Sequence, residues 1–166
     1  MKNVAKKNSI YNVLKSFSQV IFPIITFPYI SRVLMAENVG RLNFSNSIVS
    51  YVTLVASLGI STYAIRECSR VKNDRAELES VASQILSINV ITTAIAYLLL
   101  AVVLIFAGQL SSYVLLIGVL SVSVMFTTVG ADWLNIAMED FKYITIRTFL
   151  FQLLSIAAML IFVHKP

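Results

Sequence analysis

Two charged side chains beside long apolar stretches are the residues best placed to do chemistry in this sequence. Arg32 lies within "FPIITFPYISRVLMAENVGRL", and Asp132 follows 52 residues that carry no charge. A guanidinium can hold a phosphate or another anion through two parallel hydrogen bonds. Either group can instead lie at a membrane interface, where Arg32 would extend to the lipid headgroups and Asp132 would neighbour Trp133, a common interfacial anchor.

The sequence lacks the residues for most enzyme chemistry. It contains a single histidine, His164, and a single cysteine, Cys68, so neither a disulfide nor a Cys/His metal site can form within one chain. No G-x-x-x-x-G-K-[ST] loop occurs, and the chain is therefore not itself an ATPase. We expect no catalytic residue, no metal site and no cofactor, and we do not expect an enzyme.

Polar side chains recur at steps of three or four residues inside four apolar stretches, which puts each set on one face of a helix. Such faces either join membrane helices by hydrogen bonds or line a shared aqueous cavity. Because two of the sets are rich in Asn or Gln, we favour the cavity. The sets are Asn8, Asn12, Ser16, Gln19, Pro23 and Thr26; Asn43, Asn46, Ser50, Thr53, Ser57 and Ser61; Ser121, Thr128, Asp132 and Asn135; and Thr145, Thr148, Gln152 and Ser155.

Composition predicts that these stretches cross a membrane. Of 166 residues, 58% are hydrophobic and only 13% are charged, which is too little charge for a soluble domain. A spanning helix needs about 20 apolar residues, and "AGQLSS" (residues 107–112) divides the longest uncharged interval in two. The predicted fold is all-α, a polytopic membrane helix bundle. Its five helices are expected at about 10–34, 42–65, 81–107, 112–135 and 144–163.

Basic residues near the helix ends predict the orientation of the chain. Ten of the 13 lie on the side of the amino terminus, and the side richer in Lys and Arg faces the cytoplasm. A cleaved signal peptide over residues 1–36 is the alternative, but its apolar run is too long and Leu34-Met35-Ala36 is a poor cleavage site. The same helix ends explain the net charge of +5, so we expect membrane lipids, not nucleic acid, as neighbours.

Two prolines interrupt the apolar run that contains Arg32. Pro23 and Pro28 each remove a backbone donor and crowd the preceding turn, so the outer half of the first helix is expected to bend or flex. Transporters tolerate such breaks where a helix borders a cavity. A static kink that serves packing is the other interpretation.

Three segments resemble a known family. They are "PYISRVLMAENVG" (28–40), "LGISTYAIRECSR" (58–70) and "DWLNIAMEDFKYITIR" (132–147). Their order and distances resemble the amino-terminal third of polysaccharide repeat-unit (O-antigen) flippases, in the superfamily that also holds multidrug extruders. That family commonly has glycine and proline after R-V-L and the pattern W-x-x-Q-G-x-E in the fourth helix. At these positions this sequence has Met35, Ala36, Ile136 and Ala137, differences that concern local turn geometry more than the fold.

The resemblance implies two lobes of about six helices each, opening alternately to the two faces of the membrane. It implies transport of a sugar carried on undecaprenyl pyrophosphate, from the cytoplasmic to the periplasmic leaflet of the bacterial inner membrane. Residues 1–166 would form an incomplete amino-terminal lobe, either as a fragment of a longer transporter, which we favour, or as a truncated product. The implied partners are a lipid-linked oligosaccharide, membrane lipids, and the polymerase and chain-length machinery of polysaccharide assembly.

The resemblance also suggests where substrate binds. One arginine would lie at the mouth of the cavity, polar residues would line it, and two arginines at cytoplasmic helix ends would meet the pyrophosphate. Two rival functions remain: a cation-coupled multidrug extruder would use Asp132 as a proton or sodium site, and a non-transporting membrane scaffold would need no wet cavity. The expected substrate-binding residues, in the order mouth, lining and helix ends, are Arg32; Asn12, Gln19, Asn46 and Asp132; and Arg66 and Arg147.

Overall fold

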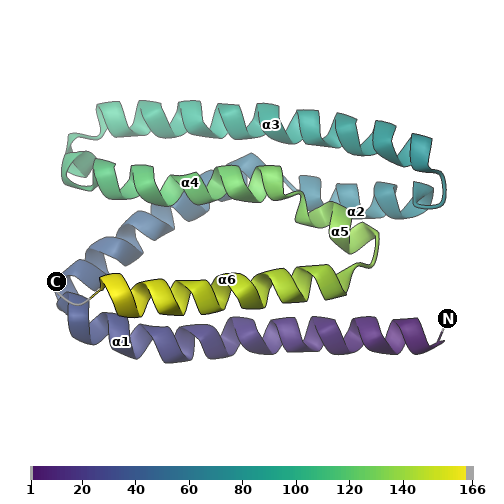
Figure 1. The fold of residues 1–166 in the computed structure, drawn as a ribbon. Helices are drawn as coiled ribbons and strands as arrows, with labels where there is room; N and C mark the ends of the chain where they lie inside the picture. The colour runs from purple at the N-terminus through teal and green to yellow at the C-terminus, as the bar shows by residue number, and fades with distance from the viewer. Residues whose placement is uncertain (1, 164–166) are drawn as a thin grey trace. The chain divides into compact units, whose positions relative to one another are not determined.

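The chain folds into helices joined by short turns (Figure 1). The structure is a computed structural model that describes residues 2–163, with side chains described from residue 8 onward. No strand occurs in this part of the chain, so the predicted all-α class is confirmed. The elements are α1 (Lys2–Ser57), α2 (Ile60–Val71), α3 (Arg75–Phe106), the 3₁₀ turn η1 (Gly108–Tyr113), α4 (Val114–Gly130), α5 (Asp132–Ala137) and α6 (Phe141–Phe162).

Large apolar side chains cover the outside of the long helices. Phe106, Leu115 and Phe126 are 83%, 83% and 74% exposed, and soluble monomers rarely expose apolar surface on this scale. The chain is a membrane protein. Within the described residues, four helical stretches are long and apolar enough to span a bilayer: Asn8–Val71, Arg75–Phe106, Gly108–Ala137 and Phe141–Phe162.

The chain divides into two compact units. Unit 1 holds residues 1–40 and 139–166, which contain the first part of α1 together with α6. Unit 2 holds residues 41–138, which contain the second part of α1 with α2, α3, η1, α4 and α5. The predicted division of the longest apolar interval is confirmed, because η1 separates α3 from α4 within unit 2.

The long helix α1 is interrupted at Met35, whose φ of 63° and ψ of 164° are not helical. The helices predicted over 10–34 and 42–65 lie on either side of this residue, but the structure joins them in one long element, so four long apolar helical stretches stand in the described residues where five helices were predicted. Pro23 and Pro28 also lie inside α1. Within α1 the non-helical φ and ψ values are those of Met35, so neither proline interrupts the helix.

Two of the predicted helices contain breaks that the sequence analysis did not find. Leu58 and Gly59 have φ values of 36° and 74°, and they end α1 so that α2 begins at Ile60. Ala131 has a φ of 42° and separates α4 from α5. The predicted ranges 42–65 and 112–135 therefore each run across a break. The two short helices that follow these breaks, α2 and α5, pack against each other.

Two apolar clusters hold unit 2 together, and alanines at these contacts let the helices approach closely. Trp133 belongs to one of them and is only 4% exposed, so its interpretation as an interfacial anchor is wrong. The first cluster joins α1, α3 and α4 through Val49, Val52, Ala56, Ala96, Leu100, Ile117 and Val124. The second joins α2, α3 and α5 through Ala64, Cys68, Ile85, Trp133 and Ala137.

Candidate functional site

In unit 1, α6 runs parallel to α1 and is hydrogen-bonded to it at three levels. Every bonded pair is separated by 134 residues, so the two helices keep one alignment along their length. A parallel direction is what the predicted topology requires of its first and fifth helices. The bonds join Thr145 Oγ1 to the carbonyl of Tyr11 (3.0 Å), Gln152 Nε2 to that of Ser18 (3.4 Å) and the Tyr29 hydroxyl to that of Val163 (2.9 Å).

This pairing uses only part of the polar faces predicted for these helices. Ser18, Thr26 and Thr145 are buried, and hydroxyls in such positions stabilise contacts between membrane helices. Asn12 and Gln19, which were predicted to bind substrate, are exposed. Small hydroxyl side chains are therefore buried between the helices of unit 1, whereas two carboxamide side chains are exposed.

The two predicted arginines of unit 1 lie near opposite ends of the paired helices. The guanidinium of Arg147 lies 5.7 Å from the centre of the Tyr143 ring, near the start of α6. Arg32 is exposed and lies three residues after Tyr29, whose hydroxyl meets the end of α6. Given a helical rise of about 1.5 Å per residue, the two arginines are roughly 30 Å apart along the helices. They cannot hold the same phosphate at once.

In unit 2, the second part of α1 packs one face into the core and leaves its predicted polar face open. Asn43, Asn46 and Ser50 are all exposed. The Ser50 hydroxyl donates to the carbonyl of Asn46 at 2.8 Å and is thus satisfied within its own helix. The carboxamides of Asn43 and Asn46 bond to no other side chain or backbone group in the described part of the chain. This face therefore presents free donors and acceptors.

A polar seam on α3 was missed by the sequence analysis. Thr92 Oγ1 donates to the carbonyl of Ala56 at 2.8 Å. That carbonyl lies in the last turn of α1, where the break at Leu58 and Gly59 leaves it without a helical donor. Thr92 thus caps a neighbouring helix. The only sequence signal was the run "NVITT" (89–93) inside an apolar stretch.

The same seam joins α3 to α4 through hydroxyl groups. Thr93 Oγ1 and Thr128 Oγ1 are 2.9 Å apart, and both residues are buried. The Tyr97 hydroxyl donates to the carbonyl of Ser121. Ser121 and Thr128 were predicted to face a shared cavity, and for these two residues the interpretation is wrong. They lie between packed helices because a buried hydroxyl that finds a partner costs little.

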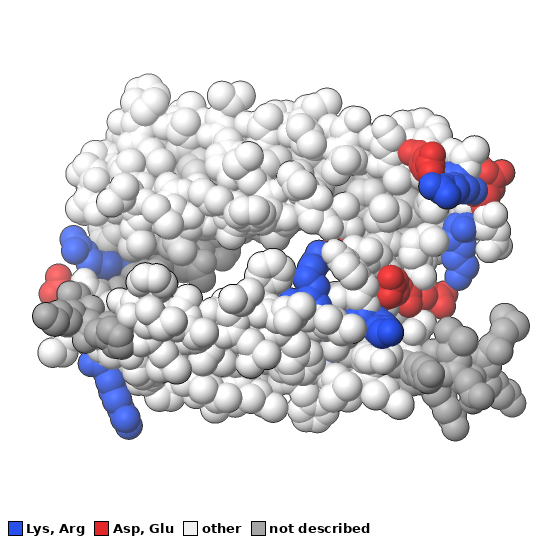
Figure 2. Space-filling view, in the orientation of Figure 1, with Lys and Arg blue, Asp and Glu red and all other residues white. Residues whose placement is uncertain are grey.

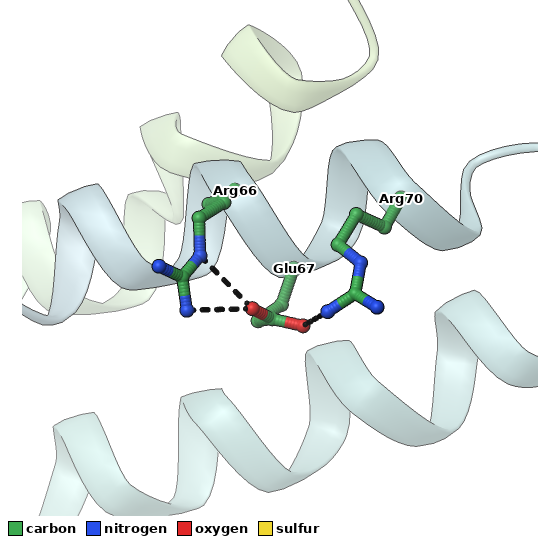
Figure 3. Close-up of polar contacts among 3 residues, drawn as sticks. All are labelled: Arg66, Glu67 and Arg70. Atoms are coloured by element: carbon green, nitrogen blue, oxygen red, sulfur yellow. Dashed lines mark hydrogen bonds and ion pairs between the residues drawn. The ribbon is translucent and has the colours of Figure 1, made fainter.

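Charge in unit 2 gathers where α2 turns into α3, and Figure 2 shows no charged side chain over most of α3 and α4 on the visible face. In Figure 3, one carboxylate lies between two guanidiniums on α2. Arg66 Nε and Nη2 each lie 3.0 Å from Glu67 Oε1, and Arg70 Nη1 lies 3.1 Å from Oε2. The two arginine side chains are 72% and 73% exposed, against 19% for the glutamate. The triad carries a net positive charge.

The three predicted site residues of unit 2 are not all close together. Asp132 begins α5 and is half-buried, and α5 packs against α2, which carries Arg66. Asn46 lies 11 residues before the end of α1, about 17 Å along the helix. Unit 2 thus brings the helices of Arg66 and Asp132 together and keeps Asn46 apart from the break.

The chain matches a protein family described as "Polysaccharide biosynthesis protein" over residues 5–166. A relative in Escherichia coli (strain K12), named "Putative O-antigen transporter", is 21% identical over 159 residues, which are 96% of this chain and 38% of the relative. A relative of the same name in Shigella dysenteriae is 25% identical over 162 residues, 97% of this chain and 40% of the relative. The chain thus spans about two fifths of the length of these relatives.

No solved structure matches the chain. The family match nevertheless covers almost all of the 166 residues, including both units and the charged end of α2. The chain belongs to the polysaccharide biosynthesis protein family.

Proposed function

We propose that the chain is part of a membrane flippase for polysaccharide repeat units. It moves O-antigen or other units linked to undecaprenyl pyrophosphate from the cytoplasmic to the periplasmic leaflet of the bacterial inner membrane, by alternating access. The observation that carries this proposal is the family match over residues 5–166. Two relatives named as O-antigen transporters support it. The same family favours a polysaccharide precursor over a drug as cargo.

The exposed carboxamides fit a sugar as cargo. Sugar hydroxyls need both donors and acceptors, and an Asn or Gln side chain offers both. Asn12 and Gln19 in unit 1 and Asn46 in unit 2 are exposed on helices whose other faces are packed. Within the hydrocarbon layer such groups require polar partners, and the repeat unit together with its water supplies them.

Arginines at the helix ends fit the pyrophosphate. The amino terminus is cytoplasmic in this proposal, which places Arg66 and Arg147 at the cytoplasmic side and Arg32 at the periplasmic side. The parallel direction of α1 and α6 is consistent with that assignment. A guanidinium binds a phosphate through two charge-assisted hydrogen bonds, so the arginines receive and release the carrier while the protein itself breaks no bond. Asp132, half-buried beside α2, lines the same path.

Surface O-antigen in cells that depend on the full-length transporter tests this function. Arg32→Ala and Arg66→Ala should each reduce surface O-antigen while membrane insertion stays intact. The matched control is Arg75→Ala, because Arg75 is 91% exposed and pairs only with Glu79 on its own helix. Normal O-antigen in both test variants would discard the anion-binding assignment. Export of cationic dyes without any effect on O-antigen would point to a drug extruder.

A further inference from the structure

We infer that α2 binds the phosphate group of a membrane lipid between Arg66 and Arg70, and that Glu67 competes with this phosphate for the two guanidiniums. The phosphate has two sources of equal chemistry, an anionic phospholipid and a polyprenyl pyrophosphate. Only the second source rests on the proposed function. The triad on α2 is the observation that carries the inference (Figure 3).

Helical spacing puts both arginines on one exposed face of α2. Arg66 and Arg70 are four residues apart and therefore neighbours on the helix surface. The opposite face is fixed in the core of unit 2, since Ala64 and Cys68 are both 0% exposed. The helix cannot turn its arginines inward without exposing that core. Both guanidiniums therefore remain available on the outside of the unit.

The bonds inside the triad leave most of the arginine donors unused. A guanidinium carries about five N–H donors, and together the two groups make three N–H···O contacts to Glu67. Two positive charges share one negative charge, so the triad itself keeps one positive charge in excess. A phosphate supplies several acceptor oxygens in the geometry that a guanidinium fork prefers.

Three neighbouring charged residues, Asp74, Arg75 and Glu79, are already paired or in use. Asp74 caps α3 by accepting from the backbone N–H groups of Ala76 and Glu77 at 3.0 and 3.1 Å. Arg75 holds Glu79 at 2.9 Å. Lys72 and Glu77 lie in the same region, and the eight charges from Arg66 to Glu79 sum to zero, so the positive excess is local to the triad on α2.

The position of the triad along the chain favours a lipid as the source of the phosphate. Arg66 is the first charge after 24 uncharged residues, which places α2 where a spanning segment leaves the hydrocarbon layer. Tyr63 is 54% exposed, and its ring lies 5.8 Å from the Arg66 guanidinium. Tyr and Arg together are typical of the headgroup level, the depth at which lipid phosphates lie.

Glu67 acts as an internal competitor because of its place between the arginines. Its two oxygens are each taken by a different guanidinium, so a phosphate that binds the unused donors of both arginines lies beside this carboxylate and is repelled by its charge. Replacement of Glu67 by glutamine keeps the shape of the side chain and removes its charge. That change should raise lipid affinity by roughly two- to five-fold, the range expected for one exposed ion pair.

Native mass spectrometry of the full-length protein in detergent tests the inference. The protein is titrated separately with phosphatidylglycerol, with undecaprenyl pyrophosphate, and with phosphatidylcholine as a neutral reference. We expect Glu67→Gln to bind one or both anionic lipids more tightly than the wild type, and Arg66→Gln and Arg70→Gln to bind them more weakly. Glu79→Gln and Arg75→Gln change the charge equally on an exposed pair nearby and should leave both affinities unchanged.

The outcomes separate the two sources and the two proposals. A response to phosphatidylglycerol alone assigns the site to membrane phospholipid, and a response to undecaprenyl pyrophosphate alone assigns it to the carrier. Equal affinities for Glu67→Gln and Glu79→Gln overturn the inference, whatever the O-antigen assay shows. Arg70→Lys keeps the charge but loses the forked pair of guanidinium donors, and it checks that weaker binding does not come from misfolding. It should bind the lipid more tightly than Arg70→Gln does. Equal affinities of these two variants count against the site.

Discussion

Replacement of Met35 by glycine should stabilise the protein, because Met35 has a backbone conformation that suits only glycine. Its φ of 63° and ψ of 164° fall in a region where any other residue costs about 1–3 kcal/mol. Its side chain is 64% exposed, so glycine forfeits little buried apolar surface.

The size of the effect follows from two opposing terms. Relief of strain contributes about 1–3 kcal/mol, and the added freedom of glycine in the unfolded chain costs about 0.4–1 kcal/mol. The net gain is then about 1 kcal/mol, which for a chain of this size raises the melting temperature by roughly 2–4 °C. Gel filtration of the detergent-solubilised protein after heating measures this shift.

Two control variants separate strain from other causes. Met35→Ala shortens the side chain but keeps a Cβ, so it should retain the strain and leave the melting temperature close to that of the wild type. Leu34→Gly places glycine at a helical position one residue earlier and should lower it, because glycine inside a helix costs about 1 kcal/mol. A Met35→Ala gain equal to that of Met35→Gly would refute the strain argument, and so would a Met35→Gly loss.

Three further predictions concern the breaks, the seam and the open polar face. Gly59→Ala should destabilise the protein by about 1–2 kcal/mol, because the φ of Gly59 is 74°; nothing lies within 4 Å of the added Cβ, so crowding plays no part. Gly118 is helical and equally uncrowded, so Gly118→Ala should instead stabilise the protein by about 0.5–1 kcal/mol in the same thermal assay. Thr92→Val should lower the free energy of unfolding by about 0.6–1 kcal/mol through the lost bond to the Ala56 carbonyl. Thermal unfolding should show no comparable decrease for Thr127→Val, because the Thr127 hydroxyl bonds only within α4. Asn46→Cys should react with a water-soluble maleimide in intact cells and Tyr51→Cys should not, although both positions are exposed. Native Cys68 is buried and gives no background. Equal labelling of both positions would contradict a water-facing side of the helix distinct from its lipid-facing side.

Hydropathy predicted the helices well because lipid solvation dominates every other influence on these segments. The final helix (α6, Phe141–Phe162) follows from it, whereas the division at residues 107–112 follows from the Gly, Gln and Ser residues of "AGQLSS". The breaks at Leu58 and Ala131 could not be found in this way. The φ values of 36° and 42° at Leu58 and Ala131 belong to residues with no left-handed preference, and only the first break has a glycine with positive φ beside it, Gly59.

The sequence named several residues of the candidate site, and their role in binding stays a prediction. Arg66 was identified from its place at a helix end, but Arg70 and the carboxylate that both arginines share became visible only in the structure. The seam on α3 was missed for a different reason. Thr92 bonds to a carbonyl 36 residues away, and no spacing rule within one helix reports such a partner.

The matched spacing of the bonds between α1 and α6 has a consequence for how this protein tolerates changes in length. All three pairs are 134 residues apart, so an insertion in a loop between the two helices lengthens the separation equally and leaves every bond intact. One residue inserted between Tyr11 and Ser18 would turn the remainder of that helix by about 100° and would remove the later partners together. Insertions are therefore tolerated in the turns between α1 and α6 but not within either of these two helices.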